Sequence, residues 1–170
     1  MKAMDKNIVL IGFMGSGKSK IARELGKRLK REVVATDDLA EAREGMSIHE
    51  IFKTKGEAYF RDVEQGIVKD VSLRRGIIID CGGGVVCAKE NLKILKANGI
   101  LFYLRATPEV IYQRIKHETH RPLLKTPDPL GCIKELYQQR LPLYNQADHV
   151  IDANDASIEG PVVEILKRIK

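Results

Sequence analysis

The sequence predicts a three-layer α/β/α fold built on a parallel β-sheet, and two observations carry this prediction. Short segments that are apolar throughout alternate along the chain with longer segments of helical periodicity. Strands without a polar face are typical of parallel sheets that helices cover on both sides. The chain has 170 residues, of which 44% are hydrophobic and 31% charged. This length and composition fit one globular domain that spans residues 1–170.

Five short apolar segments are the expected strands of this sheet. In chain order they are "NIVLI", "EVVA", "GIIID", "ILFYL" and "HVID". Ile21, Leu25 and Leu29 recur at helical spacing directly after the first of them. Strands that alternate with helices in this way are joined as parallel neighbours through crossover helices.

Local signals mark several helix ends. Ser47 and Glu50 have the spacing of a capping box, which begins a helix. Thr107-Pro108 stands in the order of an N-cap and a first helical residue. Asn98-Gly99 suits a helix C-terminus before the fourth strand, and a terminal helix is expected from about Ser157.

One segment breaks the alternation of strands and helices. The stretch "HETHRPLLKTPDPLG" contains three prolines and has no clear periodicity. Long loops inside compact domains are usually functional. We therefore expect a lid over about residues 117–130.

The stretch "GFMGSGKS", Gly12 to Ser19, matches G-x-x-x-x-G-K-S and lies between a strand and a helix, the context that confirms this phosphate-binding motif. Its glycines let successive backbone N–H groups surround phosphate oxygens. Lys18 would reach the β- and γ-phosphates of a nucleoside triphosphate, and Ser19 would bind Mg²⁺. The alternative is a plain glycine-rich turn. The nucleotide-binding residues predicted from the motif are Gly12, Gly15, Ser16, Gly17, Lys18 and Ser19.

Composition argues against several other classes of protein. Cys81, Cys87 and Cys132 are odd in number and lack C-x-x-C spacing, and the four histidines lack metal-ligand spacing. Neither a disulfide framework nor a zinc site is indicated, so we expect a cytoplasmic protein. No apolar run approaches a membrane span, so we expect no membrane partner. The net charge is +6, but the basic residues are scattered and are not interleaved with aromatics. We expect no nucleic-acid partner and a monomer.

Beyond the phosphate motif, the sequence resembles the shikimate kinases over essentially its whole length. The residues that carry the resemblance are "GFMGSGKS", "TDD", "GEAYFRDVE", "CGGGVV", "HRPLL" and "QRLPLY". The resemblance implies a P-loop kinase fold with strand order 2-3-1-4-5, substrate-binding helices over about 38–73 and a lid. It also implies ATP and Mg²⁺ as cofactors, and phosphorylation of the 3-hydroxyl of shikimate on the pathway to chorismate.

Two other kinds of function stay open on the sequence alone. A gluconate-type or nucleoside monophosphate kinase would share the phosphate motif with a different acceptor. A nucleotide-dependent switch or an RNA-binding module would also use it, but would need switch-like loops or an ordered basic stripe, neither of which we find.

Asp37 is the predicted catalytic carboxylate. On residue type alone, Asp37 and Asp38 suit a helix N-cap before "LAEAR" at least as well. The resemblance implies that Asp37 faces the reacting hydroxyl and accepts its proton, and leaves Asp38 to start the helix.

The resemblance also implies an acceptor pocket. In it, Arg61 and Arg140 hold the substrate carboxylate, for which the planar guanidinium fork is suited. Glu64, three residues after Arg61, either orients that guanidinium or forms an exposed pair. In "IIIDCGGGVV" the loop formed by Gly82, Gly83 and Gly84 would lie under the acceptor, where a side chain would collide with it.

Three further roles concern the nucleotide. The resemblance implies that Arg121, in the expected lid, folds over the transferred phosphate and neutralises its charge. It places Arg114 against the adenine, with Asn154 to Ser157 in the loop that lines the base.

The sequence departs from the family pattern at the magnesium site. The family usually has D-[ST]-D after the second strand, whereas this chain has "ATD", with Ala35 at the first position. The third strand, which usually ends in a small residue, ends here in Asp80. We hypothesise that Asp80, directly or through water, supplies with Ser19 the metal ligation that Ala35 cannot, the alternative being that Asp80 caps the following loop.

Overall fold

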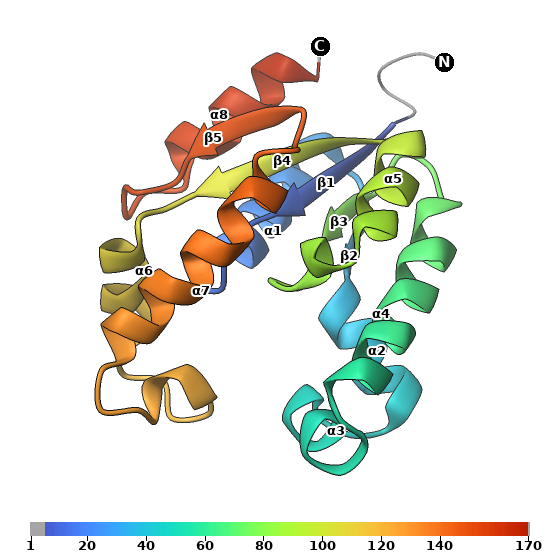
Figure 1. Ribbon diagram of the computed structural model, residues 1–170. Helices are drawn as coiled ribbons and strands as arrows, with labels where there is room; N and C mark the ends of the chain where they lie inside the picture. The colour runs from blue at the N-terminus through green and yellow to red at the C-terminus, as the bar shows by residue number, and fades with distance from the viewer. Residues whose placement is uncertain (1–5, 170) are drawn as a thin grey trace.

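The computed structural model describes residues 6–169 and contains one five-stranded parallel sheet (Figure 1). Its strand order, β2-β3-β1-β4-β5, is the predicted one. The strands are β1 (Asn7–Ile11), β2 (Val33–Ala35), β3 (Ile78–Asp80), β4 (Gly99–Arg105) and β5 (His149–Asp152). All five lie where the apolar segments predict them, although β3 begins two residues later than expected.

Eight α-helices and two short 3-10 turns connect the strands within the described residues. The helices are α1 (Lys18–Leu29), α2 (Thr36–Glu44), α3 (Ile48–Lys55), α4 (Glu57–Ser72), α5 (Lys89–Asn98), α6 (Pro108–Ile115), α7 (Pro129–Tyr144) and α8 (Glu159–Arg168). The 3-10 turns are Val85–Cys87 and Pro122–Leu124. In residues 6–169 no helix combines the length and the apolar character that crossing a membrane requires.

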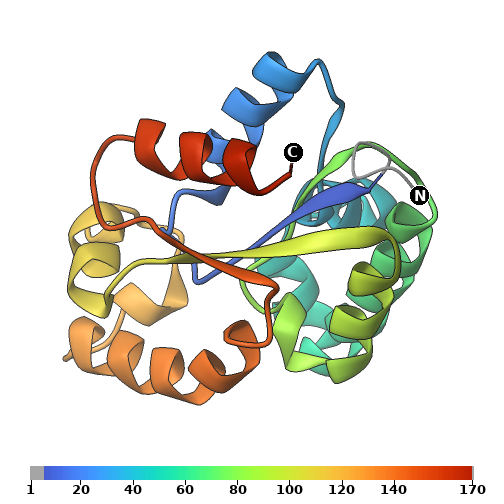
Figure 2. The same cartoon turned by 90° about the horizontal axis from the view of Figure 1, so that it is seen from above.

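Two hydrophobic cores, one on each face of the sheet, make the three layers. Ile8 and Leu10 point to the face covered by α1 and α8, whereas Val9 and Ile11 belong to the cluster on the face covered by α4, α5 and α7. Figure 2 shows this separation from above, with α1 and α8 on one side of the sheet and α5 and α7 on the other. Alternate residues of one strand therefore serve opposite cores, which is why the strands are apolar throughout.

The local signals locate two helix starts correctly. Ser47 and Glu50 form the predicted capping box at the start of α3, each side chain bonding the other residue's backbone N–H. The Thr107 side chain accepts a hydrogen bond from Val110 N, with Pro108 as the first residue of α6.

Three boundary predictions are corrected. Helix α2 begins at Thr36 with Ala35 as its N-cap, so Asp38 lies within the first turn and does not start the helix. Helix α8 begins at Glu159, two residues after the expected Ser157. Helix α5 does end at Asn98, but Gly99 is extended and begins β4, and a Cβ there would lie only 2.7 Å from Val9 Cγ2. Gly99 is therefore needed for close packing and not for a left-handed cap.

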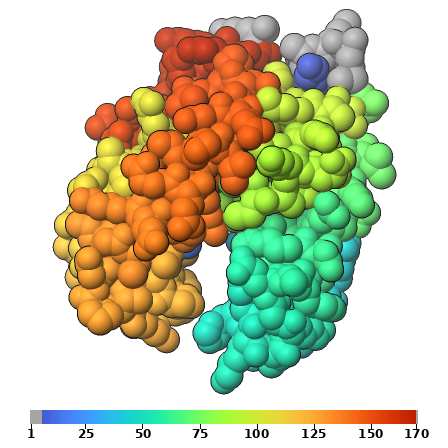
Figure 3. Space-filling model, in the orientation of Figure 1, coloured from blue at the N-terminus to red at the C-terminus, as the bar shows by residue number. Residues whose placement is uncertain are grey.

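Two arms project from the carboxyl end of the sheet. One contains α2, α3 and α4, which together cover the predicted substrate-binding range, and the other contains the predicted lid between α6 and α7. The space-filling view shows the surface hollowed between these arms (Figure 3). A parallel sheet brings the ends of its strands to one edge, and ligands of such sheets bind in the crevice there.

Candidate active site

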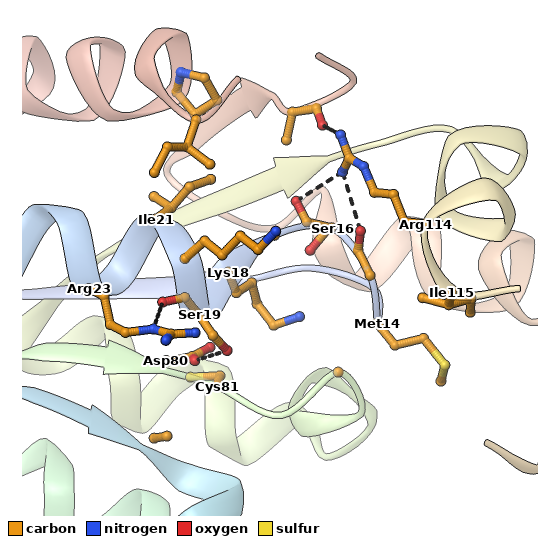
Figure 4. A pocket seen from close by; sticks show the side chains of 18 of the residues that line it. Met14, Ser16, Lys18, Ser19, Ile21, Arg23, Asp80, Cys81, Arg114 and Ile115 are labelled. Atoms are coloured by element: carbon orange, nitrogen blue, oxygen red, sulfur yellow. Dashed lines mark hydrogen bonds between the residues drawn. The ribbon is translucent and has the colours of Figure 1, made fainter. Parts of the chain in front are cut away.

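A cavity of about 1130 Å³ opens at the carboxyl ends of the strands. Its walls come from the loop after β1, the start of α2, the end of β3 with the first glycines that follow, the lid, and the loop after β5. Figure 4 shows the side chains that point into it from the β1–α1 loop and from the end of β3. Most of the predicted site residues therefore meet in one place although they are spread over the whole sequence.

The β1–α1 loop has the form of a phosphate cradle. Gly15 and Gly17 have left-handed backbone angles, φ +74° and +96°, which favour glycine. Helix α1 begins directly after Gly17 with no side-chain cap and no acidic residue in its first turn. Its first N–H groups, with the positive end of the helix dipole, are thus directed at the cavity. Gly12 does not line the cavity but packs against Leu104, where a Cβ would lie 2.7 Å from the carbonyl oxygen.

The Lys18 side chain is buried beneath this loop. Its Nζ donates hydrogen bonds to the carbonyl oxygens of Gly12, at 2.9 Å, and Phe13, at 3.1 Å. Burial lowers the pKa of Lys18, while the carboxylates of Asp80 and Asp37 oppose that shift. The ammonium group is thus held by two backbone carbonyls of the phosphate loop and lies in the field of two acids.

Ser19 and Asp80 meet at the wall of the cavity. Ser19 Oγ donates a hydrogen bond of 2.6 Å to Asp80 Oδ2 (Figure 4). Burial raises the pKa of Asp80, and the bond from Ser19 and the charge of Lys18 act against the rise. A hydroxyl and a carboxylate this close are hard oxygen donors of the kind that Mg²⁺ accepts. In residues 6–169 no group of three or more His, Cys, Asp or Glu side chains gathers as a metal site.

Each residue of the glycine loop faces a different neighbour. A Cβ on Gly82 would overlap the Asp37 carboxylate, and one on Gly84 would lie 2.5 Å from the guanidinium nitrogens of Arg61. A Cβ on Gly83 would lie 3.4 Å from Met14 N in the phosphate loop. A side chain at Gly82 or Gly84 would therefore displace the protein's own Asp37 or Arg61, whereas at Gly83 the contact would be an ordinary one. The sequence analysis had attributed the exclusion to the acceptor alone.

Asp37 lies in the first turn of α2 with its carboxylate against Gly82. Burial raises its pKa, Lys18 lowers it, and Asp80 raises it further. Thr36, which the sequence analysis overlooked, accepts a hydrogen bond of 2.9 Å from Gly82 N and ties the start of α2 to the loop. The sequence did offer a signal for Thr36, because it occupies the Ser or Thr position of the family pattern D-[ST]-D, here "ATD".

Arg61 and Arg140 approach the glycine loop from α4 and α7. Arg61 Nη1 donates to Glu64 Oε1 at 3.0 Å, and Glu64 is 2% exposed, so the orienting interpretation of Glu64 is confirmed over the exposed one. Arg140 Nη1 donates to Gly83 O at 3.4 Å. Among the described residues, four side-chain atoms are buried without a hydrogen-bond partner, namely Arg140 Nε, Glu64 Oε2, Ser16 Oγ in the phosphate loop and Asn91 Oδ1 on α5. Buried polar groups normally have a hydrogen-bond partner. Unpaired ones beside the cavity are therefore consistent with a site that binds a polar ligand.

The lid carries its own counter-ion. Arg121 lines the cavity, and its Nε is paired with Glu118, which also lines the cavity. Glu118 is a second residue that the sequence analysis did not select, although it stands three positions before Arg121. In this conformation the charge of Arg121 is neutralised from within the lid.

The two predicted adenine residues differ in position. Arg114 lines the main cavity and donates hydrogen bonds to carbonyl oxygens on both sides of it, including Gly15 at 3.2 Å and Ala153 at 2.7 Å (Figure 4). Asn154 lines a smaller neighbouring hollow, and its side chain bonds Thr107 N and Asp152. The Asn154 side chain thus holds the loop together, and its contact with a base stays a prediction.

The sequence profile of the shikimate kinase family matches residues 14–170. The chain belongs to the shikimate kinase family. Shikimate kinases from Thermodesulfovibrio yellowstonii and Dehalococcoides mccartyi are each 44% identical to it, over 162 and 165 residues. These alignments cover 95% and 96% of this chain and 94% and 93% of the relatives.

Solved structures of shikimate kinases have the same architecture. The enzyme from Acinetobacter baumannii in complex with shikimate superposes with a TM-score of 0.92 at 32% identity, covering 98% of this chain and 94% of that one. The Aquifex aeolicus shikimate kinase gives a TM-score of 0.83 at 38% identity, with coverages of 95% and 94%. A deoxyadenosine kinase from M. mycoides reaches 0.63 at 16% identity and shares the fold alone. The P-loop kinase fold and the kinase class are therefore confirmed, and a nucleotide acceptor is not favoured.

Proposed function

We propose that this protein transfers the γ-phosphoryl group of ATP to the 3-hydroxyl of shikimate, forming shikimate 3-phosphate and ADP. The observation that carries the proposal is the meeting of Asp37, Arg61 and Arg140 around one glycine loop beside a phosphate cradle. The Asp37 carboxylate can bind a hydroxyl of the acceptor, and the Arg61 and Arg140 guanidinium groups can bind its carboxylate. This combination suits a carboxylated polyol. A nucleotide acceptor would need a second base pocket.

In the proposed reaction each residue handles one charge or proton. Lys18 and Arg121 neutralise the transferred phosphoryl group, Arg121 after leaving Glu118 as the lid closes. Asp37 accepts the proton of the 3-hydroxyl as its oxygen bonds phosphorus and the bond to ADP breaks, and later releases that proton to solvent. Arg61 and Arg140 keep the acceptor in line with the phosphate.

We further propose that Mg²⁺ is bound by Ser19 and by Asp80, directly or through water. When bound, the ion would withdraw negative charge from the phosphate oxygens. The proposal is supported by the 2.6 Å contact between the two oxygen donors and by the position of Asp80 at a strand end beside the cradle. Mg²⁺ keeps several waters and needs few protein ligands, so the small donor set fits this ion.

We also propose that the protein acts as a monomer in the cytoplasm. The cavity is lined by residues of this chain, and the cysteines Cys81, Cys87 and Cys132 are free thiols, as in a reducing compartment. Light scattering after size-exclusion chromatography tests the first point, and a dimer mass would contradict it.

The deciding experiment measures ADP release with ATP and Mg²⁺ and, in parallel, shikimate, gluconate, AMP or CMP. We expect stimulation by shikimate alone, no stimulation by 3-deoxyshikimate, which lacks the acceptor hydroxyl, and weak binding of the uncharged methyl ester. Lys18→Ala should abolish turnover, whereas Lys27→Ala, on the exposed side of α1, should not. Failure of shikimate to stimulate ADP release would refute the proposed acceptor.

A further inference from the structure

A cluster of three buried tyrosines from β4 and α7 lies behind the glycine loop. Tyr144 is fully buried, and its ring stacks on Tyr103 of β4 with 5.0 Å between centroids and 12° between planes. The Tyr103 hydroxyl in turn hydrogen-bonds the Tyr137 hydroxyl at 3.0 Å. The stack places the Tyr144 ring by contact with β4, an inner strand of the sheet.

The Tyr144 hydroxyl forms a hydrogen bond outside this cluster, with the glycine loop. It donates to the carbonyl oxygen of Gly83 at 2.5 Å, which satisfies a buried phenol that needs a partner. Arg140, one helical turn earlier on α7, donates to the same oxygen at 3.4 Å. Burial raises the pKa of Tyr144 to about 12, so the hydroxyl keeps its proton at neutral pH and remains a donor.

Gly83 also lies beside the phosphate loop. A Cβ built on Gly83 would lie 3.4 Å from Met14 N and 3.7 Å from Gly12 O. Gly83 is therefore held between the loop that would carry the donor phosphates and a hydroxyl anchored on the sheet. The carbonyl of Gly83 and the N–H of Gly84 belong to one planar peptide unit, so fixing the oxygen also fixes the direction of that N–H.

We propose that Tyr144 is a positioning residue for phosphoryl transfer, whose hydroxyl anchors the Gly83 carbonyl and thereby sets the distance and orientation of the glycine loop relative to the phosphate loop. This inference rests on the proposed function, in which the glycine loop is the surface that receives the acceptor. Hydrogen bonds to the carbonyl also polarise the peptide and strengthen the Gly84 N–H as a donor. Tyr144 itself touches neither substrate.

The test compares Tyr144→Phe with Tyr137→Phe. Each variant loses one buried hydroxyl from the same cluster and keeps its ring, but only Tyr144→Phe removes the shorter of the two hydrogen bonds to the Gly83 carbonyl, leaving the 3.4 Å bond from Arg140. For Tyr144→Phe we expect kcat/KM for shikimate to fall about tenfold, as for loss of one buried hydrogen bond, with an unchanged KM for ATP. Tyr137→Phe should keep both kinetic constants. Its melting temperature should fall by about as much as that of Tyr144→Phe, because each variant loses one buried hydrogen bond. Equal losses in the two variants, or no loss in Tyr144→Phe, would overturn the inference.

A second measurement needs no acceptor and separates this inference from the proposed function. In the ligand-free protein, Tyr144→Phe should move the Gly84 amide resonance toward that of a weaker donor and accelerate its hydrogen exchange, and Tyr137→Phe should do neither. If shikimate does not stimulate ADP release by the wild type, the proposed function fails. The Gly84 amide measurement then decides by itself whether Tyr144 anchors the loop. An unshifted Gly84 amide in Tyr144→Phe rejects the anchor.

Discussion

Ala35 and Asp80 are partners in the register of the parallel strands β2 and β3, each at the last position of its strand. A carboxylate at either position would therefore begin from the same edge of the sheet, next to Ser19. The acid missing from β2 has a neighbour on β3 that already hydrogen-bonds the Ser19 hydroxyl at 2.6 Å. Compensation between the two strands is thus geometrically simple.

Asp80→Asn should raise the Mg²⁺ concentration required for half-maximal activity about tenfold or more, because the amide still accepts from Ser19 but carries no charge. Calorimetry of ADP binding, which needs no turnover, should show the same rise in the Mg²⁺ concentration required. Adding Ala35→Asp to Asp80→Asn should restore much of the response, since the two positions are neighbours. Unchanged Mg²⁺ dependence in Asp80→Asn would show that Asp80 only caps its loop.

Arg61→Lys should raise the KM for the acceptor about tenfold or more and leave the KM for ATP unchanged. Lysine keeps the charge that pairs with buried Glu64 but loses the planar fork. This choice avoids Arg61→Ala, which would leave the Glu64 carboxylate buried and unpaired. Arg43→Lys, on an exposed pair with Asp70, is the matched control. An acceptor KM equal to that of the wild type would remove Arg61 from the pocket.

The glycine loop should respond differently at its two ends. Gly82→Ala displaces the Asp37 carboxylate and should mainly lower kcat, whereas Gly84→Ala displaces the Arg61 guanidinium and should mainly raise the acceptor KM. Gly160→Ala in α8 lies outside the site and has no atom beyond its chain neighbours within 4 Å of its new Cβ, so it should keep full activity. Identical kinetic profiles for the two loop variants would contradict this division.

Asp37→Asn should raise the stability of the protein at neutral pH while lowering its activity. Because burial raises the pKa of Asp37 above 3.8, its contribution to stability is present below that value and is lost as the pH rises through the folded-state pKa. The neutral variant escapes this loss, so its melting temperature should exceed that of the wild type at neutral pH.

The advantage of Asp37→Asn should shrink as the pH falls, when the wild-type carboxyl also becomes neutral. Its kcat should nevertheless drop about 10²-fold or more, because the proton acceptor is gone. Thermal unfolding and steady-state rates across pH measure both effects. A variant less stable than the wild type at neutral pH would contradict the assigned direction of the pKa.

The sequence by itself determined the elements and the phosphate cradle. Strand cores, the capping box at Ser47 and the glycines of "GFMGSGKS" are signals that act within one or two turns of chain, so they can be recognised without the partners they later meet. The roles of Asp37, Arg61 and Arg140 were predicted only through family resemblance, because a single charged residue on a helix is usually a surface residue.

Only the tertiary structure decided which of these groups touch. The bond between Ser19 and Asp80 joins residues 61 positions apart, and the bond between Tyr144 and Gly83 joins another pair separated by 61 positions. Such contacts depend on strand order, register and helix packing, which local pattern does not encode. The same holds for the glycines of "CGGGVV": their spacing indicated a close approach, but the parallel sheet decided that Asp37 and Arg61 are what approaches.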